Sequence, residues 1–349
     1  MESQLKISFA IPVYHARLVD LRTCITSVRN QSIIHDIDYE ILVVIDGKSE
    51  NVETLQSGLL DGDDIHVVVQ EHAGEAVARN RAIHEARGKY LIFVDADDYL
   101  EPKAAENMLK AATSQSRIDA VFANHSRVVG GYAKAIDYYK KIQTCTSESD
   151  ILRYALSVGT DQGTVWGKLF DVQYLVENEL VFKASLVNGV DQEFMVRFAL
   201  TKPRVITTPS CVYAYRYNTD SVVRKYDPEY LRNVDKTISE IGEDLESVDS
   251  VDRDIYPLYL CDRLLLCLMN DTFNRGAKFS LLENRKRFRE LISKSTFANA
   301  LRKADISDLD VSRRIVLRLC KYRCFFAVWM IVGARQMEKD IQQRSKKNQ

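Results

Sequence analysis

Short apolar segments alternate with helical segments through the first hundred residues, and this alternation is the strongest constraint on the fold. Four runs have the composition of buried strands: KISFAIPV, EILVVI, IHVVVQ and YLIFV, at residues 6–13, 40–45, 65–70 and 90–94. Continuous apolar runs are typical of strands that are covered on both faces. The segments between them have helical spacing, as in Asp20–Arg29 and Glu75–Arg87. Strands joined by helices predict an α/β fold with a mostly parallel central sheet.

The segments that follow the four strands carry the residues with the most chemistry. Ligands of open parallel sheets bind at the carboxyl ends of the strands, so we expect these segments to form one crevice. They are Val13–His15, Asp46–Gly47, Gln70–Gly74 and Asp95–Asp98.

An acidic DxDD sequence, Asp95-Ala96-Asp97-Asp98, comes directly after the fourth strand. Three carboxylates this close repel one another unless a cation or a donor-rich ligand compensates them. Mg²⁺ or Mn²⁺ prefers oxygen ligands and would bridge them to phosphate oxygens. The same acids could instead cap the next helix. The buried strand before them favours the metal site.

Charge is distributed unevenly along the chain. The formal net charge is −1, which gives no general attraction to nucleic acid. Residues 313–349 hold ten Lys or Arg and two acids, which leaves −9 on the rest of the chain. The uncharged run Cys324–Ala334 has 11 residues, fewer than the roughly 20 that span a bilayer.

Two stripes run along this basic tail at helical spacing. The basic stripe consists of Arg314, Arg318 and Lys321. The apolar stripe beside it consists of Ile315, Leu319, Tyr322 and Phe326, followed by Trp329 and Met330. This pattern is typical of a helix that lies at an anionic membrane surface. It is equally typical of a helix docked on the protein.

Other residue types exclude several classes of site. The seven cysteines are odd in number and include no CxxC, which fits reduced thiols in the cytoplasm. The six histidines all lie at or before His125, are not spaced for zinc, and are expected at the surface or in turns. Residues 229–349 contain only three glycines and one proline, which predicts a helical region.

Seven short motifs, in order over roughly residues 5–225, resemble those of family 2 glycosyltransferases with the GT-A fold. Each motif alone is weak, but the ordered set is specific. The motifs are Ile11-Pro12-Val13-Tyr14-His15, Ile45-Asp46-Gly47-Lys48-Ser49, Gly74-Glu75-Ala76-Val77-Ala78-Arg79-Asn80, Asp95-Ala96-Asp97-Asp98, Trp166-Gly167-Lys168-Leu169-Phe170, Val190-Asp191-Gln192-Glu193-Phe194 and Tyr213-Ala214-Tyr215-Arg216 with the nearby Ser221-Val222.

The resemblance implies an inverting, metal-dependent enzyme of bacterial surface-polysaccharide biosynthesis. It would move a hexose from a nucleotide-sugar, UDP-linked, to a hydroxyl of a growing glycan on a lipid carrier. It implies a Rossmann-like GT-A domain over residues 1–228, with a donor half to about 104 and an acceptor half from about 105. A helical region, 229–349, follows. The expected location is the cytoplasm, at the inner face of the plasma membrane through the basic tail.

On the donor side, the resemblance assigns a role to each matching position. Pro12 and Tyr14 would line the base and ribose. Asp46 would accept a hydrogen bond from uracil N3–H, and Asp95 would bind the ribose side. Asp97 would ligate Mn²⁺ or Mg²⁺.

On the acceptor side, Asp191 matches the general base that takes the proton of the attacking hydroxyl. Glu193 is the alternative base. Arg79, a donor-binding residue, would face the nucleotide or its phosphates as a fixed hydrogen-bond donor. Trp166 and Lys168 would lie on the acceptor side, where Trp166 either stacks against a sugar or packs in the core.

Two departures from the family pattern leave other functions open. Ile45 and Val190 stand where the family has acids, which would suit a non-catalytic assembly subunit, although Asp95 and Asp97 are intact. A nucleotidyltransferase also uses an α/β sheet and acidic metal ligands. The Gly-rich basic phosphate loop that such enzymes usually carry near the N-terminus is absent after Val13.

Overall fold

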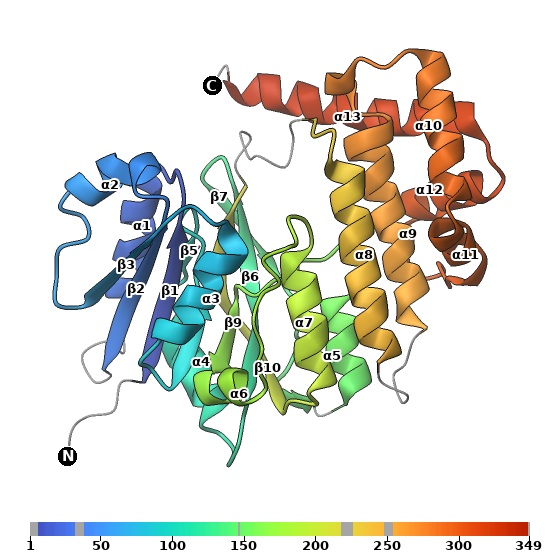
Figure 1. Ribbon diagram of the computed structural model, residues 1–349. Helices are drawn as coiled ribbons and strands as arrows, with labels where there is room; N and C mark the ends of the chain where they lie inside the picture. Colours follow the sequence, from blue (N-terminus) through green and yellow to red (C-terminus); the bar gives the residue numbers. More distant parts are fainter. Residues whose placement is uncertain (1–5, 32–37, 146, 218–225, 248–253, 348–349) are drawn as a thin grey trace. The chain divides into compact units, whose positions relative to one another are not determined.

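The computed structural model describes residues 6–31, 38–145, 147–217, 226–247 and 254–347 (Figure 1). The chain divides into two compact units. The sheet unit comprises residues 1–155, 162–186 and 190–217, and the helical unit comprises residues 156–161, 187–189 and 218–349. The domain boundary expected at residue 228 stays a prediction.

The first half of the sheet is parallel, with strand order β3-β2-β1-β4. Each strand lies within one or two residues of the run expected from sequence. The α/β fold with a mostly parallel sheet is therefore confirmed. The elements are β1 (Ile7–Val13), α1 (Leu18–Arg29), β2 (Tyr39–Asp46), α2 (Val52–Gln56), β3 (Ile65–Gln70), α3 (Glu75–Glu85) and β4 (Tyr90–Phe93).

The second half of the sheet is mixed. Strand β9 (Lys168–Asp171) runs antiparallel between β4 and β6 (Ala120–Val129), and β10 (Val205–Arg216) is parallel to β6. Strand β10 is continuous, but its register against β6 shifts after Thr208. The remaining elements are β5 (Tyr99–Leu100), α4 (Ala104–Ala112), β7 (Tyr132–Ile136), β8 (Gln143–Cys145), α5 (Glu148–Ala155), α6 (Val172–Glu177) and α7 (Val190–Leu200).

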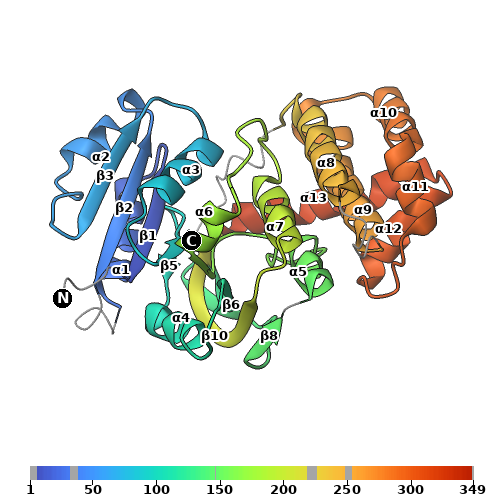
Figure 2. The ribbon, with the colours of Figure 1, turned by 60° about the horizontal axis from the view of Figure 1, so that its bottom comes forward.

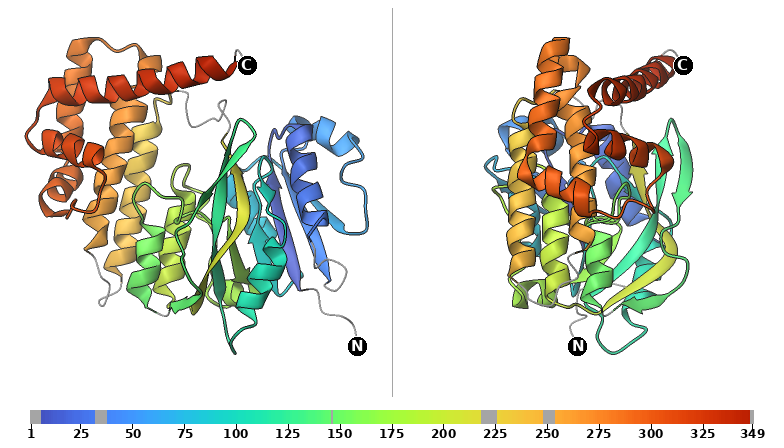
Figure 3. Two further views of the ribbon diagram at one scale, coloured as in Figure 1. Left: turned by 180° about the vertical axis from the view of Figure 1, so that it is seen from behind. Right: turned by 90° about the vertical axis from the view of Figure 1, so that its right-hand side faces the viewer.

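Successive side chains of each strand point to opposite faces of the sheet, and helices cover both faces. In β1, Ile7, Phe9 and Ile11 point to the face where Leu21 and Ile25 of α1 complete a hydrophobic core. Helix α3 covers the other face, in front of the strands in Figure 1, whereas α1 lies in front when the unit is seen from behind (Figure 3). Both faces of β1, β2 and β4 are thus buried, as their apolar runs predict, whereas the edge strand β3 is only partly buried and its Val69 is exposed.

The helical unit confirms the helical C-terminal region (Figure 2). Helix α10 begins with a capping box, in which Ser280 and Glu283 each accept a hydrogen bond from the other's backbone N–H. Among the described residues, no helix has both the length and the apolar character that a bilayer crossing requires. The helices are α8 (Tyr230–Glu246), α9 (Ile255–Cys267), the π-helical turn Leu268–Thr272, α10 (Leu281–Ser293), α11 (Ser295–Lys303), α12 (Val311–Lys321) and α13 (Phe325–Lys347).

Candidate functional site

The carboxyl ends of the parallel strands meet in the sheet unit, as expected. Tyr14, after β1, stacks on His72, after β3, with ring centroids 4.3 Å apart. Asp46, at the end of β2, is hydrogen-bonded to His72 through Nδ1 at 2.8 Å. Arg79, in α3, reaches Asp95, after β4, at 3.3 Å. The four segments therefore form one site.

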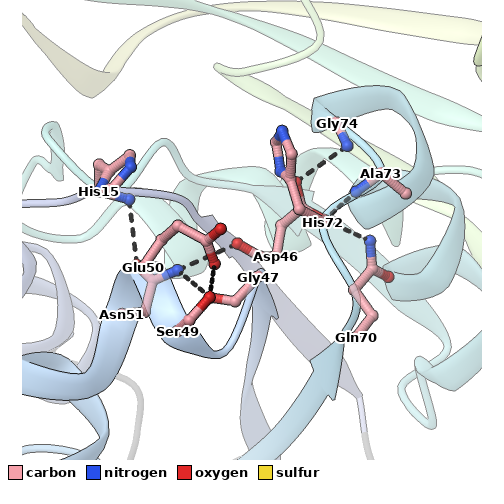
Figure 4. Close-up of polar contacts among 10 residues, drawn as sticks. All are labelled: His15, Asp46, Gly47, Ser49, Glu50, Asn51, Gln70, His72, Ala73 and Gly74. Carbon is pink, nitrogen blue, oxygen red and sulfur yellow. Dashed lines mark hydrogen bonds and ion pairs between the residues drawn. The ribbon is translucent and has the colours of Figure 1, made fainter.

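Asp46 is the most heavily bonded carboxylate of this site (Figure 4). Its Oδ1 accepts from Gln70 Nε2 at 2.9 Å and from the Ala73 amide at 2.8 Å. Its Oδ2 accepts from His72 Nδ1 and from the Gly74 amide, at 2.8 and 2.9 Å. A carboxylate offers about four acceptor positions, and here the chain itself fills all four. The role expected for Asp46, acceptor of uracil N3–H, therefore has no free position in this structure.

The turn after β2 is closed by Asn51, which the sequence analysis missed. Its Nδ2 donates to the carbonyls of Asp46 and Gly47, at 3.0 and 2.7 Å, and its Oδ1 accepts from the His15 amide at 3.0 Å. His15 has φ +49°, in the left-handed region where Asn, Asp and His are enriched. Asn51 thus ties the turn after β1 to the turn after β2 (Figure 4).

Asp46 also fixes the orientation of His72. A carboxylate only accepts hydrogen bonds, so His72 Nδ1 carries the hydrogen and Nε2 is left for another partner. Tyr14 lies against one face of the imidazole, and the two rings are tilted by only 14°. His72 was expected at the surface or in a turn, within the crevice segment Gln70–Gly74, and here it contacts both Asp46 and Tyr14.

Replacing Asp46 with asparagine is expected to destabilise the protein by about 2 kcal/mol at pH 7, because an amide cannot accept from all four donors. Burial alone would raise the pKa of Asp46, but hydrogen bonds from Gln70, Ala73, Gly74 and His72 outweigh burial and lower it. Because the pKa of Asp46 is lower in the folded chain than in the unfolded chain, its carboxylate stabilises the fold. This contribution is complete above about pH 4 and is lost as the pH falls further. Urea unfolding should therefore show a difference between wild type and variant that shrinks below about pH 4. A constant difference would contradict this account.

The three aspartates after β4 have different environments. Asp98 is buried and accepts from the Tyr213 hydroxyl at 2.8 Å and the Arg216 amide at 2.7 Å, which anchors the turn to β10. Asp95 is partly buried, and Asp97 is exposed. Burial raises the pKa of Asp95 and of Asp98 above the usual range, and neighbouring carboxylates add to this effect.

The donor set of this turn suits a hard cation. Within the described ranges, no group of three or more His, Cys, Asp or Glu side chains is arranged to hold a metal by itself. Mg²⁺ is commonly bound through one or two carboxylates together with substrate phosphates. An exposed Asp97 beside Asp95 provides that kind of oxygen site, which a diphosphate would complete.

Arg79 joins the acidic turn to the proposed base. Its side chain is only 3% exposed. Its guanidinium contacts Asp191 at 2.5 Å, Glu75 at 2.6 Å and Asp95 at 3.3 Å. Arg79 thus contacts three carboxylates and holds them together, and its role toward the nucleotide or its phosphates stays a prediction.

Asp191 lies in the first turn of α7. Its Oδ1 accepts from Arg79 and its Oδ2 accepts from the Val165 amide at 3.0 Å, so the carboxylate has one fixed orientation. Glu193, the alternative base, is fully buried and pairs with Lys183 and Arg197 at 3.0 and 2.5 Å. The geometry therefore favours Asp191 over Glu193 for contact with a substrate.

The two residues expected on the acceptor side are mostly buried. Trp166 is stacked on Tyr213 at 4.7 Å and on Tyr215 at 5.6 Å, which corresponds to the core-packing alternative. The Lys168 ammonium donates to the Thr164 carbonyl at 2.5 Å and lies over the Phe122 ring. Neither side chain presents a free face to a sugar here.

Pro12 lies at the end of β1, partly exposed beside Tyr14. Ile45, which replaces a family acid, is fully buried in the core against α1, so an apolar residue suits its position. Gln70 and His72 belong to no motif, so no individual role was predicted for them. Their only signal was the expected crevice segment Gln70–Gly74 at the end of an apolar strand.

Residues 8–166 match the model of Glycosyl transferase family 2. The Putative glycosyltransferase EpsH of Bacillus subtilis (strain 168) is 24% identical over 348 residues, which cover 97% of this chain and 98% of that protein. The Poly(ribitol-phosphate) beta-glucosyltransferase of Bacillus spizizenii is 25% identical over 62% of this chain and 33% of its own length.

A solved structure has the same fold. S. aureus TarS 1-349, crystallised in complex with UDP-GlcNAc, superposes with a TM-score of 0.66 and 15% identity over 96% of this chain and 92% of that one. This match shows the GT-A fold. The ordered motifs, the family match over residues 8–166 and the relative of equal length agree. Residues 8–166 therefore match the family 2 glycosyltransferases, and over its whole length the chain is similar to a putative glycosyltransferase.

Proposed function

We propose that this chain transfers a hexose from a UDP-sugar to a hydroxyl of a bacterial surface glycan, carried on a lipid, with inversion and with Mn²⁺ or Mg²⁺. One observation carries the proposal: Arg79 holds the donor-side Asp95 and the acceptor-side Asp191 in one cluster. The relative that is named for poly(ribitol-phosphate) and the UDP-GlcNAc complex of TarS support the acceptor and donor classes.

The chemistry assigned to the residues is a single displacement. The acceptor hydroxyl gives its proton to the Asp191 carboxylate while its oxygen bonds to the anomeric carbon. The bond from that carbon to the diphosphate oxygen breaks, and its electron pair leaves with the nucleoside diphosphate. Arg79 and the Val165 amide keep Asp191 oriented for this step. A cation bound by Asp97, with Asp95 beside it, would offset the charge on the leaving diphosphate.

We assign the binding of the donor's nucleobase to Tyr14 and His72. Because Asp46 has no free acceptor position, we propose that Asp46 orients His72 and that His72 Nε2 contacts the base. A neutral imidazole with its hydrogen on Nδ1 offers Nε2 as an acceptor. That acceptor matches the N3–H of uracil and not the unprotonated N3 of cytosine.

Hydrolysis of a panel of UDP-, CDP-, GDP- and ADP-sugars with Mn²⁺ tests this proposal. UDP-sugars should be hydrolysed fastest. His72→Phe keeps a ring against Tyr14 but removes both nitrogens, so the donor KM should rise about tenfold with little change in kcat. His84→Phe, at an exposed position of α3, is the matched control. Hydrolysis without preference for UDP, or an unchanged KM in His72→Phe, would contradict the assignment.

We also propose that the chain works at the inner face of the plasma membrane. Helix α12 and the first half of α13 are docked in the helical unit through Val316, Leu317 and Val328, which are buried. Phe326 and Trp329 of the apolar stripe stay partly exposed. The tail therefore packs against the helical unit on one side and still exposes apolar side chains on the other. Its basic residues suit binding to an anionic membrane surface.

A further inference from the structure

Helix α13 has two apolar faces, and only one of them is used for packing. The buried side chains are Phe325, Val328 and Val332. The exposed ones, 39–61% accessible, are Phe326, Trp329, Met330 and Met337. Their spacing of three, four and seven residues places them on one side of the helix. We call these four residues the outer stripe.

A groove of about 440 Å³ lies beside the outer stripe, within the helical unit. One wall is formed by Trp329, Gly333 and Met337 of α13, and the opposite wall includes Phe273 and Phe279. This volume is within the range of small-molecule sites, which are mostly apolar with a few polar groups. The groove can therefore hold an apolar chain.

The polar groups of the groove define the rest of its occupant. Arg275 and Lys278 line it, and no Asp or Glu does so among the described residues. A ligand with an anionic group would complement these two cations.

A second hollow, of about 330 Å³, lies where α13 begins, around Phe326. Arg285, Arg289 and Arg323 line it, again without an acid among the described lining residues. Basic side chains thus line both the groove and the second hollow beside the outer stripe. An apolar strip with cations and no acids complements an anionic lipid better than it complements a neutral apolar peptide.

We propose that this groove binds one anionic glycerophospholipid. The acyl chain lies against Trp329, Gly333 and Met337. Arg275 and Lys278 bind the phosphate. This inference rests on the proposed function, which places the chain at the plasma membrane. It adds one specific lipid-binding site to the electrostatic attraction between the basic tail and the anionic membrane surface.

Gly333 allows the groove to be filled without disturbing the fold. A Cβ built at this glycine meets no atom within 4 Å. Leu in place of Gly in a helix favours the helical state by up to about 1 kcal/mol. Gly333→Leu should therefore keep the protein folded while its side chain occupies the space of the lipid. Gly333→Ala is the matched control, because it changes the helix propensity and adds only a methyl group.

Trp329 reports the binding directly, because it lines the groove and the other tryptophan, Trp166, is buried in the core. The full chain is titrated with dioctanoylphosphatidylglycerol below its critical micelle concentration, and tryptophan emission is followed. Wild type and Gly333→Ala should show a saturable change. Gly333→Leu should bind at least tenfold more weakly. Equal binding by all three proteins would overturn the proposed site.

The headgroup is tested with the pair Arg275→Gln and Lys278→Gln, which should weaken phosphatidylglycerol binding to the level of dioctanoylphosphatidylcholine. Lys236→Gln with Lys303→Gln has the same net charge, changes two exposed residues outside the groove, and should bind as wild type does. Glycerol phosphate should bind much more weakly than the lipid. Equal affinity for phosphatidylcholine or for glycerol phosphate would overturn the lipid assignment.

Two further measurements separate this inference from the proposed function. Sedimentation with phosphatidylglycerol vesicles should follow the same order of variants, whereas phosphatidylcholine vesicles should bind less. UDP-sugar hydrolysis, measured on the same preparations, should be equal in all groove variants. Lipid binding without hydrolysis would overturn the proposed function and leave the groove assigned. Hydrolysis without lipid binding would overturn the groove alone.

Discussion

Asp97→Ala is expected to abolish sugar transfer, with a loss of roughly 10³-fold or more, about 4 kcal/mol of transition-state stabilisation. Asp97 is the exposed carboxylate of the acidic turn, whereas Asp98 is buried against Tyr213 and Arg216. Its own backbone carbonyl accepts from the Arg216 side chain, and that contact does not depend on the carboxylate. The turn should therefore keep its shape. Transfer rates and calorimetric binding of UDP with Mn²⁺ measure the effect.

Asp98→Asn is the informative comparison for this variant. It disturbs a buried carboxylate and should lower the melting temperature, whereas Asp97→Ala should melt within a few degrees of wild type. Loss of activity without loss of stability would assign Asp97 to substrate and cation binding. Full activity in Asp97→Ala, or in excess chelator, would remove the metal-dependent mechanism.

Asp191→Asn should lower turnover by about 10² or more, because an amide cannot take the proton of the acceptor hydroxyl. Asparagine has the same shape, and its Oδ1 can still accept from the Val165 amide. The donor KM should therefore change little, and the loss should fall on kcat. Steady-state kinetics with donor and acceptor varied separately distinguish the two parameters.

Glu193→Gln is the matched control. Glu193 lies between Lys183 and Arg197 without solvent exposure, so its loss leaves two cations without their shared carboxylate. Removing one partner of a buried ion pair costs about 3–5 kcal/mol. We expect reduced thermal stability and a smaller effect on kcat. The reverse ranking of the two variants would move the role of base to Glu193, and near-normal rates in both would eliminate a carboxylate base from this helix.

The parallel half of the sheet could be predicted because its strands carry their own signal. Residues 65–70 form β3 with both ends as expected. The mixed half lacks such signals. β5 has two residues and pairs with Tyr213 and Ala214, far along the chain. In β10 the polar break at Thr208 looks like a loop but is a register shift within one strand.

The position of the site could be predicted from the sequence, but the hydrogen-bond partners of each side chain could not. The motifs place Asp46, Asp95 and Asp191 together, since strand ends converge on one edge. They do not reveal that Asp46 is already bonded by four donors, because Gln70 and His72 belong to no motif. Whether an acid is a ligand or a structural anchor depends on partners that only the folded chain brings within hydrogen-bond distance.

The ion pairs of Arg79 have a consequence for recombining family members. A chimera that joins the first 104 residues of this chain to the acceptor half of a relative would separate Arg79 from its own Asp191. The incoming half must supply a carboxylate at the same place in its helix. Otherwise a guanidinium that is 3% exposed loses one of its counter-charges. Exchange of acceptor specificity by module swapping is therefore limited by compatibility at this junction, and crossovers should be screened for that pair before pocket residues are redesigned.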